Sequence, residues 1–400
     1  VRCRRHYPLG FSDTVIGAAC DGVTRVLVRW EVPGEGTTSF SIADENGAAA
    51  NIGSLAPPGQ TPRGSSLYNI PAVQENGKWF AFAEYIVPLD FWRSSADSNA
   101  ISRPVKFTAN WVPSAGGFLV QATKNLNLVR PPVLLLHGYT GWAKDWAWSM
   151  QTDPRFVVWA EGYHDWSTLP FWVNVHFAKD GANQAVDLMR YSRHIAATQT
   201  SVVGHSMGGL LARLHAANRN NDYFRSGNLG QGDFYKLITL YTPHFGSGFA
   251  CLAESLLQTP EDRQLVNKFL PQFHIADGAV HDLRPDRSEI QNLPAIDVPT
   301  HVIAGVGGST WLEMNTDPTF PANQVNFLAR WLAKAFNIDL LSLTGSTDND
   351  LVVGSASAFG GLPVAARSTV GWISPATQGI HTTGPAEEYI GDQVVRVLLD

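Results

Sequence analysis

"TSVVGHSMGGLLARLH", residues 200–215, is the stretch that decides the fold. Two valines of an expected buried strand run into a Gly-x-Ser-x-Gly sequence, and residues typical of a helix follow from Met207. A serine in this setting marks a nucleophile elbow, a sharp turn that lifts the side chain above the end of the strand. Gly204 and Gly208 flank the serine because larger side chains would collide with neighbouring backbone. We therefore expect Ser206 Oγ at the edge of a parallel sheet, above a helix N-terminus.

A serine hydroxyl becomes a strong nucleophile only with a base beside it, and the base needs a carboxylate to orient it. In this architecture the three residues follow in the order Ser, acid, His. His381 is the only histidine after Asp350, so chain order alone selects His381 as the base. Asp348 and Asp350 are both candidates for the acid, because residues two apart in an extended segment face the same side. Asp350 stands directly before "LVV", where the following segment would anchor it.

Negative charge that develops on a substrate oxygen during acyl transfer needs two N–H donors. One donor is expected to be the amide of Met207, directly after the serine. The other is expected from "LLLHGYTG", where the amide of Tyr139 follows His137 and a glycine that permits close backbone approach. We expect His137 to brace this loop and His205 to be a packing residue within the elbow.

Strands and helices alternate from about residue 128 onward. Expected strands are "PVLLLHG" (132–138), "TSVVG" (200–204), "KLITLYT" (236–242), "THVIAGVG" (300–307) and "DLLSLTG" (339–345). Expected helices are "ANQAVDLMRYSRHIAA" (182–197), "MGGLLARLHAAN" (207–218), "NQVNFLARWLAKAF" (323–336) and "IGDQVVRVLLD" (390–400). Short, continuously apolar strands separated by helices predict an α/β fold with a mostly parallel sheet and helices on both faces.

The first 122 residues have a different character. Four segments are rich in β-branched and aromatic residues, at 23–32, 38–44, 78–87 and 104–112, and turn formers separate them. This pattern predicts an all-β, sandwich-like N-terminal domain. We therefore expect two domains, 1–122 and 123–400. Within the second, residues 248–299 are expected to form a cap or lid insertion, and Val266, Phe269 and Phe273 would give it apolar walls.

Four stretches of the chain from about 128 to 400 together resemble the bacterial lipases and esterases of the α/β-hydrolase superfamily. These are "HGYTG" of the expected oxyanion loop, "GHSMGG" of the elbow, "TPHFGS" (242–247) and "DNDLVVGSAS" (348–357). The resemblance implies an α/β-hydrolase fold and a serine hydrolase that cleaves carboxylic esters through an acyl-enzyme. It also favours Asp350 as the acid. No cofactor is implied, and the first 120 residues resemble no family that we can name.

Composition excludes several other classes. The 400 residues carry a formal net charge of -6 without a basic run, so nucleic acid is not an expected partner. No uninterrupted apolar stretch has the length of a transmembrane segment. No cysteine pair has zinc-site spacing, and His164, Asp165 and His176 lack a recognised metal-ligand pattern. The expected partner is a small-molecule or lipid ester, with a polyester as a further option.

The N-terminus bears on localisation. The chain begins "VRCRRHYPLG", without an initiator methionine or an apolar signal core, which fits a mature secreted form or a trimmed chain. We expect the former, an extracellular protein whose signal peptide is absent from this sequence. A Cys3–Cys20 disulfide would close a short loop, worth roughly 3 kcal/mol in the chain-entropy model, and the alternative is two unpaired thiols.

Three other functions fit the same residues. An acyltransferase would pass the acyl group to an alcohol other than water, and a polyester depolymerase would combine the triad with an open cleft. A binding module with an inert hydrolase domain belongs to another class, and it disagrees with an intact set of serine, histidine and aspartate.

Overall fold

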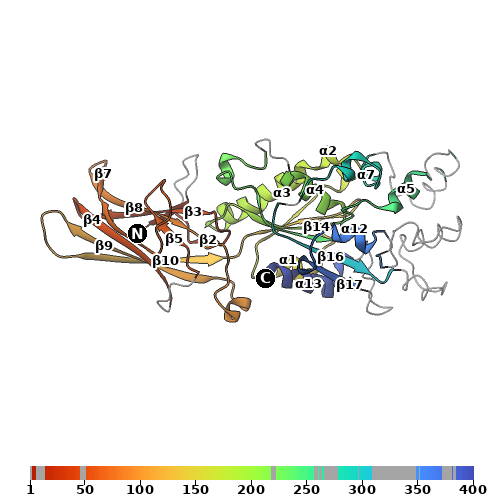
Figure 1. Cartoon of the computed structure of the whole chain (residues 1–400). Helices are drawn as coiled ribbons and strands as arrows, with labels where there is room; N and C mark the ends of the chain where they lie inside the picture. Colours follow the sequence, from red (N-terminus) through yellow and green to blue (C-terminus); the bar gives the residue numbers. More distant parts are fainter. Residues whose placement is uncertain are drawn as a thin grey trace.

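The computed structural model describes residues 2–5, 14–45, 51–217, 222–255, 260, 264, 278–295, 297–308, 348–350, 352–371, 381 and 384–400. Three sheets organise this part of the chain. Figure 1 shows two of them in the N-terminal half, beside a third sheet that helices cover.

Two sheets of the N-terminal half share one core. The first contains β1 (Arg2–Arg5), β3 (Arg25–Val32), β5 (Ser54–Ala56), β7 (Val73–Glu75) and β8 (Lys78–Ile86). The second contains β2 (Gly17–Ala19), β4 (Gly36–Asp44), β6 (Ser66–Pro71), β9 (Arg103–Pro113), β10 (Val120–Val129) and β13 (Ile195–Ala196). Side chains alternate between core and surface, so that Val28 and Trp30 of the first sheet join Phe40 and Phe107 of the second in one hydrophobic cluster. The four segments expected as strands correspond to β3, β4, β8 and β9.

The two halves of the chain are connected through the second sheet. β10 pairs with β9 from Val120 to Leu128, so the domain boundary predicted between residues 122 and 123 falls inside a strand. β13 comes from the C-terminal half and pairs in parallel with β2. The division into two domains stays a prediction.

The helix expected over residues 182–197 is wrong at its C-terminal end. Helix α3 (His176–Asp187) continues as one π-helical turn (Leu188–Ser192), and the chain is already extended at Ile195–Ala196. His194 adopts a φ of 53°, which a helix cannot continue through. The backbone of β13 then pairs with β2, a partner distant in sequence that overrides the local helical pattern.

The C-terminal half forms one six-stranded sheet in which every strand pair is parallel. Its spatial order is β12 (Val158–Glu161), β11 (Val133–Leu136), β14 (Thr200–His205), β15 (Phe234–Leu240), β16 (Thr300–Val306) and β17 (Arg367–Gly371). The sequence analysis did not expect β12 and β17, although "FVVWA" (156–160) is a short apolar run that leads into β12. The expected strand 339–345 and helix 323–336 lie outside the described residues.

Helices cover both faces of this sheet, the α/β arrangement that the sequence predicts. In β11, Leu134 and Leu136 pack into a cluster with α3 and α4 (Met207–Ala217), whereas Val133 and Leu135 pack with α1 (Trp148–Thr152) and α13 (Glu388–Leu399). Figure 1 shows α3 and α4 on one side of the sheet and α1 and α13 on the other. The other helices among the described residues are α2 (Phe171–Asn174), α5 (Gly248–Ser255), α7 (Ala279–Asp282), α8 (Ser288–Gln291) and α12 (Ser355–Phe359). The 3-10 turns are η1 (Ser95–Asn99), η2 (His164–Trp166), η4 (Ser226–Asn228), η5 (Val364–Ala366) and η6 (Gly384–Ala386).

The described parts of the expected cap, 248–299, pack against the C-terminal sheet and its helices. Ala250 and Ala253 of α5, Val280 of α7 and Ile290 of α8 join the cluster that covers one face of the sheet. Val266, Phe269 and Phe273, which were expected to wall an acyl pocket, lie outside the described residues. A cap or lid therefore stays a prediction.

The Cys3–Cys20 disulfide is not supported. Cys20 is a free thiol, completely buried, and burial raises its pKa. Cys3 lies in β1 of the first sheet, whereas Cys20 directly follows β2 of the second. Secretion stays a prediction. Among the helices that the structure describes, none has the length and hydropathy to span a bilayer.

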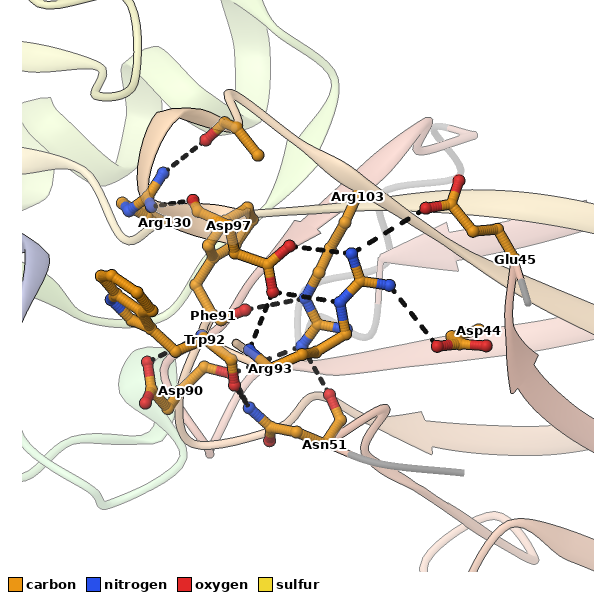
Figure 2. A network of polar contacts seen from close by, with 11 residues as sticks. Asp44, Glu45, Asn51, Asp90, Phe91, Trp92, Arg93, Asp97, Arg103 and Arg130 are labelled. Atoms are coloured by element: carbon orange, nitrogen blue, oxygen red, sulfur yellow. Dashed lines mark hydrogen bonds and ion pairs between the residues drawn. The ribbon is translucent and has the colours of Figure 1, made fainter. Parts of the chain in front are cut away.

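A network of arginines supports the junction between the two halves (Figure 2). Arg93 Nη2 lies 2.8 Å from Asp97 Oδ1, and its hydrogen bond lowers the pKa of that carboxyl. Arg103 is buried and donates from Nε to the Phe91 carbonyl at 2.8 Å. Arg130, just before β11, donates from Nη2 to the Asp97 carbonyl at 2.9 Å, and burial lowers its pKa to about 10. The loop between β8 and β9 is thereby fixed to the start of the C-terminal sheet.

Asp21 forms a second buried connection. Its carboxylate accepts hydrogen bonds from the Val23 and Thr24 amides and the Thr24 hydroxyl, all on its own side of the junction. From the C-terminal half, the amides of Thr198 and Gln199 donate to Oδ2 at 3.0 and 3.1 Å. Because Asp21 is only 1% exposed, water does not replace these donors.

Candidate active site

Ser206 occupies a sharp turn between β14 and α4. Its φ is 51°, a strained value for a residue other than glycine. A Cβ on Gly204 would lie 2.5 Å from Gly209 Cα, and a Cβ on Gly208 would lie 2.3 Å from the Leu136 carbonyl oxygen. Glycine is therefore required on both sides of the serine, because the turn lies too close to α4 and β11 for a larger side chain.

The structure brings Ser206, His381 and Asp350 together in one hydrogen-bonded chain. His381 Nε2 lies 2.8 Å from Ser206 Oγ, and His381 Nδ1 lies 2.8 Å from Asp350 Oδ2. An ionised carboxylate only accepts hydrogen bonds, so Nδ1 carries the proton and Nε2 is left to accept the serine hydroxyl. This is the arrangement in which an imidazole acts as a general base toward serine.

Asp350, and not Asp348, contacts the histidine. Asp350 is 1% exposed, and its Oδ1 accepts the amides of Val352 and Val353 at 3.0 and 2.7 Å. Its carbonyl also accepts the amide of His381 at 3.2 Å. The Asp348 side chain is exposed, and its carbonyl accepts the amide of Ser355. Two residues that sequence spacing leaves equivalent are thus distinguished by the amides of Val352 and Val353, which hold the Asp350 carboxylate.

The expected oxyanion donors lie on either side of the serine. Met207 is the first residue of α4, and the first N–H groups of a helix have no partner within it. Tyr139 follows Gly138, where a Cβ would lie 2.8 Å from Ser206 Cβ. The loop after β11 therefore runs directly beside Ser206. The Tyr139 side chain packs against the hydrophobic cluster beneath, and burial raises the pKa of its hydroxyl.

His137 braces the loop that carries Tyr139. Its Nε2 accepts the amide of Tyr163 at 3.1 Å, so its Nδ1 carries the proton and donates to the Gly138 carbonyl at 2.8 Å. The ring stacks on Tyr163 with centroids 3.9 Å apart. Burial lowers the pKa of His137 to about 4, so the ring is neutral near neutral pH.

His205 contacts the backbone of His381, which the sequence did not indicate. Its Nε2 lies 2.8 Å from the carbonyl oxygen of His381, and a carbonyl only accepts, so Nε2 carries the proton. Burial lowers the pKa of His205 well below its ordinary value, which keeps the ring neutral. The partners are 176 residues apart in sequence, so no local pattern could have identified this contact.

The "TPHFGS" stretch (242–247) packs against the first turn of α4, directly after the elbow. A Cβ on Gly209 would lie 2.1 Å from Thr242 Oγ1. His244 lies between Thr239 Oγ1, at 3.1 Å from Nε2, and Arg213 Nη1, at 3.4 Å from Nδ1. Burial, with the Arg213 charge adding to it, lowers the pKa of His244 to about 3.

Gly305, at the end of β16, is a further residue that sequence reasoning missed. A Cβ there would lie 2.6 Å from Asp350 Cβ and 2.8 Å from Tyr241 Cε1. Tyr241 is buried, adopts a φ of 55°, and has its ring centroid 6.0 Å from that of His381. Gly305 thus leaves the room in which Asp350 and Tyr241 pack together.

The described residues contain no group of three or more His, Cys, Asp or Glu side chains placed to hold a metal ion. His164 Nδ1 faces the carbonyls of Thr140 and Gly141, and His176 Nδ1 faces the Val173 carbonyl at 2.6 Å. These histidines therefore form local contacts with backbone.

Residues 178–256 match the model of a family described as "Putative serine esterase (DUF676)". The match runs from within α3, through the elbow, to just past α5. Among solved structures, the chain is similar to the mature form of the Bacillus licheniformis lipase BlEst2, with 18% identity, a TM-score of 0.41 and coverage of 66% of this chain and 91% of that one. It is also similar to lipase 1 from Pelosinus fermentans, with 12% identity, a TM-score of 0.34 and coverage of 67% and 98%. Esterase B from Lactobacillus rhamnosis has 14% identity, a TM-score of 0.34 and coverage of 77% and 84%.

Proposed function

We propose that this protein is a serine hydrolase that cleaves carboxylic esters through an acyl-enzyme. The observation that carries the proposal is the hydrogen-bonded chain from Ser206 through His381 to Asp350, with 2.8 Å at each of its two contacts. The similarity of residues 178–256 to a serine esterase family supports the same chemistry.

In the proposed mechanism, Ser206 Oγ attacks the ester carbonyl carbon while its proton passes to His381 Nε2. The carbonyl oxygen takes up the negative charge and accepts the amides of Tyr139 and Met207. When the tetrahedral intermediate collapses, the bond to the alcohol oxygen breaks, and His381 returns the proton to the leaving alcohol. Water repeats the sequence on the acyl-enzyme, which releases the carboxylic acid and frees Ser206.

Asp350 keeps the histidine in the required tautomer. Its Oδ2 accepts the proton of Nδ1, and its Oδ1 is held by two backbone amides. The carboxylate therefore cannot rotate away, and it stabilises the imidazolium that forms when Nε2 takes up the serine proton.

The decisive experiment compares the full chain with its Ser206→Ala variant on p-nitrophenyl esters of two to eight carbons. We expect the variant to lose about 10⁴-fold or more in kcat while the far-ultraviolet spectrum is unchanged. A fluorophosphonate probe should label the wild-type chain at Ser206 and leave the variant unlabelled. Equal activity in both proteins would contradict the proposal.

The rival acyltransferase is tested in the same assay. An added primary alcohol competes with water for the acyl-enzyme, and the ratio of new ester to free acid measures the preference. We expect free acid to dominate. An excess of transferred ester at millimolar alcohol would replace hydrolase by transferase without changing the roles of the three residues.

A further inference from the structure

The loop that carries Tyr139 contains a strained residue next to the expected oxyanion donor. Thr140 has a φ of 52°, and a β-branched residue rarely adopts a positive φ. The amide of Gly141 donates to the carbonyl of Gly138 at 3.1 Å, so residues 138–141 form a β-turn with Thr140 at its third position. A positive φ at that position belongs to a type II turn, where glycine is the usual residue. Such strain persists only where surrounding contacts enforce it.

Two contacts hold the Thr140 backbone, one on each side. Ser167 Oγ accepts the Thr140 amide at 3.0 Å and donates to the carbonyl of His164 at 2.7 Å. His164 Nδ1 lies 3.1 Å from the Thr140 carbonyl and 3.0 Å from the Gly141 carbonyl. Carbonyls only accept, so Nδ1 carries the proton and donates. The His164 ring is stacked on Trp142 with centroids 3.6 Å apart, which fixes its orientation.

These contacts act on the peptide that would bind the oxyanion. The Tyr139 amide shares its peptide plane with the Gly138 carbonyl, which accepts from His137 Nδ1 and from the Gly141 amide. In a trans peptide the N–H points opposite to the C=O, so anchoring that carbonyl directs the Tyr139 N–H away from His137. The next peptide joins Tyr139 to Thr140, and its orientation is what differs between type I and type II turns. Ser167 Oγ accepts the N–H of this peptide.

We propose that Ser167 and His164 are positioning residues for the oxyanion hole, which hold Thr140 in its strained conformation so that the Tyr139 amide stays directed at the substrate oxygen. Ser167 is completely buried and belongs to none of the sequence motifs. The inference rests on the proposed function, since it assigns a task within that same site. It predicts an effect on the transition state, where the oxyanion exists, and little effect on substrate binding.

The test uses Ser167→Ala in the full chain, with Ser201→Ala as a matched control. Ser201 is also a buried serine, but it lies at the amino end of β14, away from the sheet edge that carries Ser206. We expect Ser167→Ala to lower kcat about 10-fold or more, less than the roughly 10²- to 10³-fold known for deleting a donor outright, with KM within about twofold. The control should keep both constants.

Thr140→Gly distinguishes positioning from general packing. Glycine adopts a positive φ without strain, so the turn needs the Ser167 contact less. We expect Ser167→Ala to cost several-fold less kcat in the Thr140→Gly background than in the wild type. Similarly, His164→Asn, which keeps an N–H near the position of Nδ1, should retain more kcat than His164→Leu.

An unchanged kcat in Ser167→Ala would overturn the inference. Equal losses of kcat on Ser167→Ala in the wild-type and Thr140→Gly backgrounds would also overturn it. Both results leave the hydrolase proposal intact, because that proposal depends on Ser206→Ala. If the wild-type chain hydrolyses no ester and Ser206 is not labelled, the proposed function itself is wrong.

Discussion

The neutral imidazole of His205 donates a hydrogen bond to the backbone carbonyl of His381, the proposed base. His205→Leu removes the N–H that donates to the His381 carbonyl, whereas His205→Gln keeps an amide N–H at nearly the same reach. We expect the leucine variant to lose about 10- to 100-fold in kcat, because an error of an ångström in a reacting group has a cost of this order. The glutamine variant should retain most activity. Steady-state kinetics of both variants check this, and equal kcat values would contradict it.

The two aspartates at 348 and 350 differ in what they touch, so their substitution should differ as well. Asp350→Asn exchanges a carboxylate that accepts the His381 Nδ1 proton for an amide that favours the wrong tautomer. We expect kcat to fall by about 10⁴-fold, the order measured when a triad aspartate is replaced in this way. Asp348→Asn, on an exposed side chain, should stay within about twofold of wild type. The reverse ranking would transfer the acid role to Asp348.

Candidate site residues that are marked by a fixed spacing or by their order along the chain could be identified from the sequence. Ser206 follows from its flanking glycines, and His381 follows from being the last histidine. The choice of Asp350 required the two backbone amides that donate to its Oδ1. His205 and Gly305 could not be found, because each acts on a residue from another element. Whether these residues perform the chemistry stays a prediction.

At the scale of the element, the elbow is restricted by backbone rather than by side chains. Gly208→Ala would place a Cβ 2.3 Å from the Leu136 carbonyl oxygen, and neither β11 nor α4 can move without disturbing the sheet. We expect a loss of about 1–3 kcal/mol or more in the free energy of unfolding, together with lost activity. Gly34→Ala is the control, because a Cβ there meets nothing closer than 4.0 Å. Thermal melting of both variants measures the difference, and equal melting temperatures would contradict it.

Elements were predicted best where the apolar pattern was continuous. "PVLLLHG" and "KLITLYT" became β11 and β15, since strands buried on both faces need apolar residues throughout. The helix expected to reach residue 197 ends with a π-helical turn at Ser192, since Ile195–Ala196 pair with β2 instead. "RSTVG", which forms β17, carries no signal of its own and is a strand because β16 lies beside it.

The stability of the whole molecule should depend on pH through its buried histidines. The pKa of His137 is lowered to about 4 and that of His244 to about 3, below the ordinary value of 6.5. The unfolded chain therefore binds more protons below 6.5, and stability falls as the pH decreases from 6.5 toward those values. We expect a loss of roughly 2 kcal/mol per histidine between about pH 7 and pH 5. Urea unfolding at the two pH values measures it, and His244→Gln should reduce the difference.

The junction at Asp21 should make the two halves unfold together. Asp21→Ala leaves the buried amides of Thr198 and Gln199 without their acceptor, which costs about 1–3 kcal/mol for each unsatisfied group. We expect one calorimetric transition in the wild type, at a temperature that the substitution lowers. Separate transitions for the two halves would show that the junction does not couple them.

The pairing of β13 with β2 also has a consequence for biosynthesis. A ribosome releases the chain from the N-terminus, so β2 and β10 emerge well before Ile195 and Ala196. At 5–20 residues per second, the interval from Val129 to Ala196 lasts roughly 3 to 13 s. During that time the free edge of β2 has unsatisfied N–H and C=O groups, which can pair with strands of other chains. Slowed translation after residue 129 should therefore lower the soluble yield, and trigger factor or another nascent-chain chaperone should restore it.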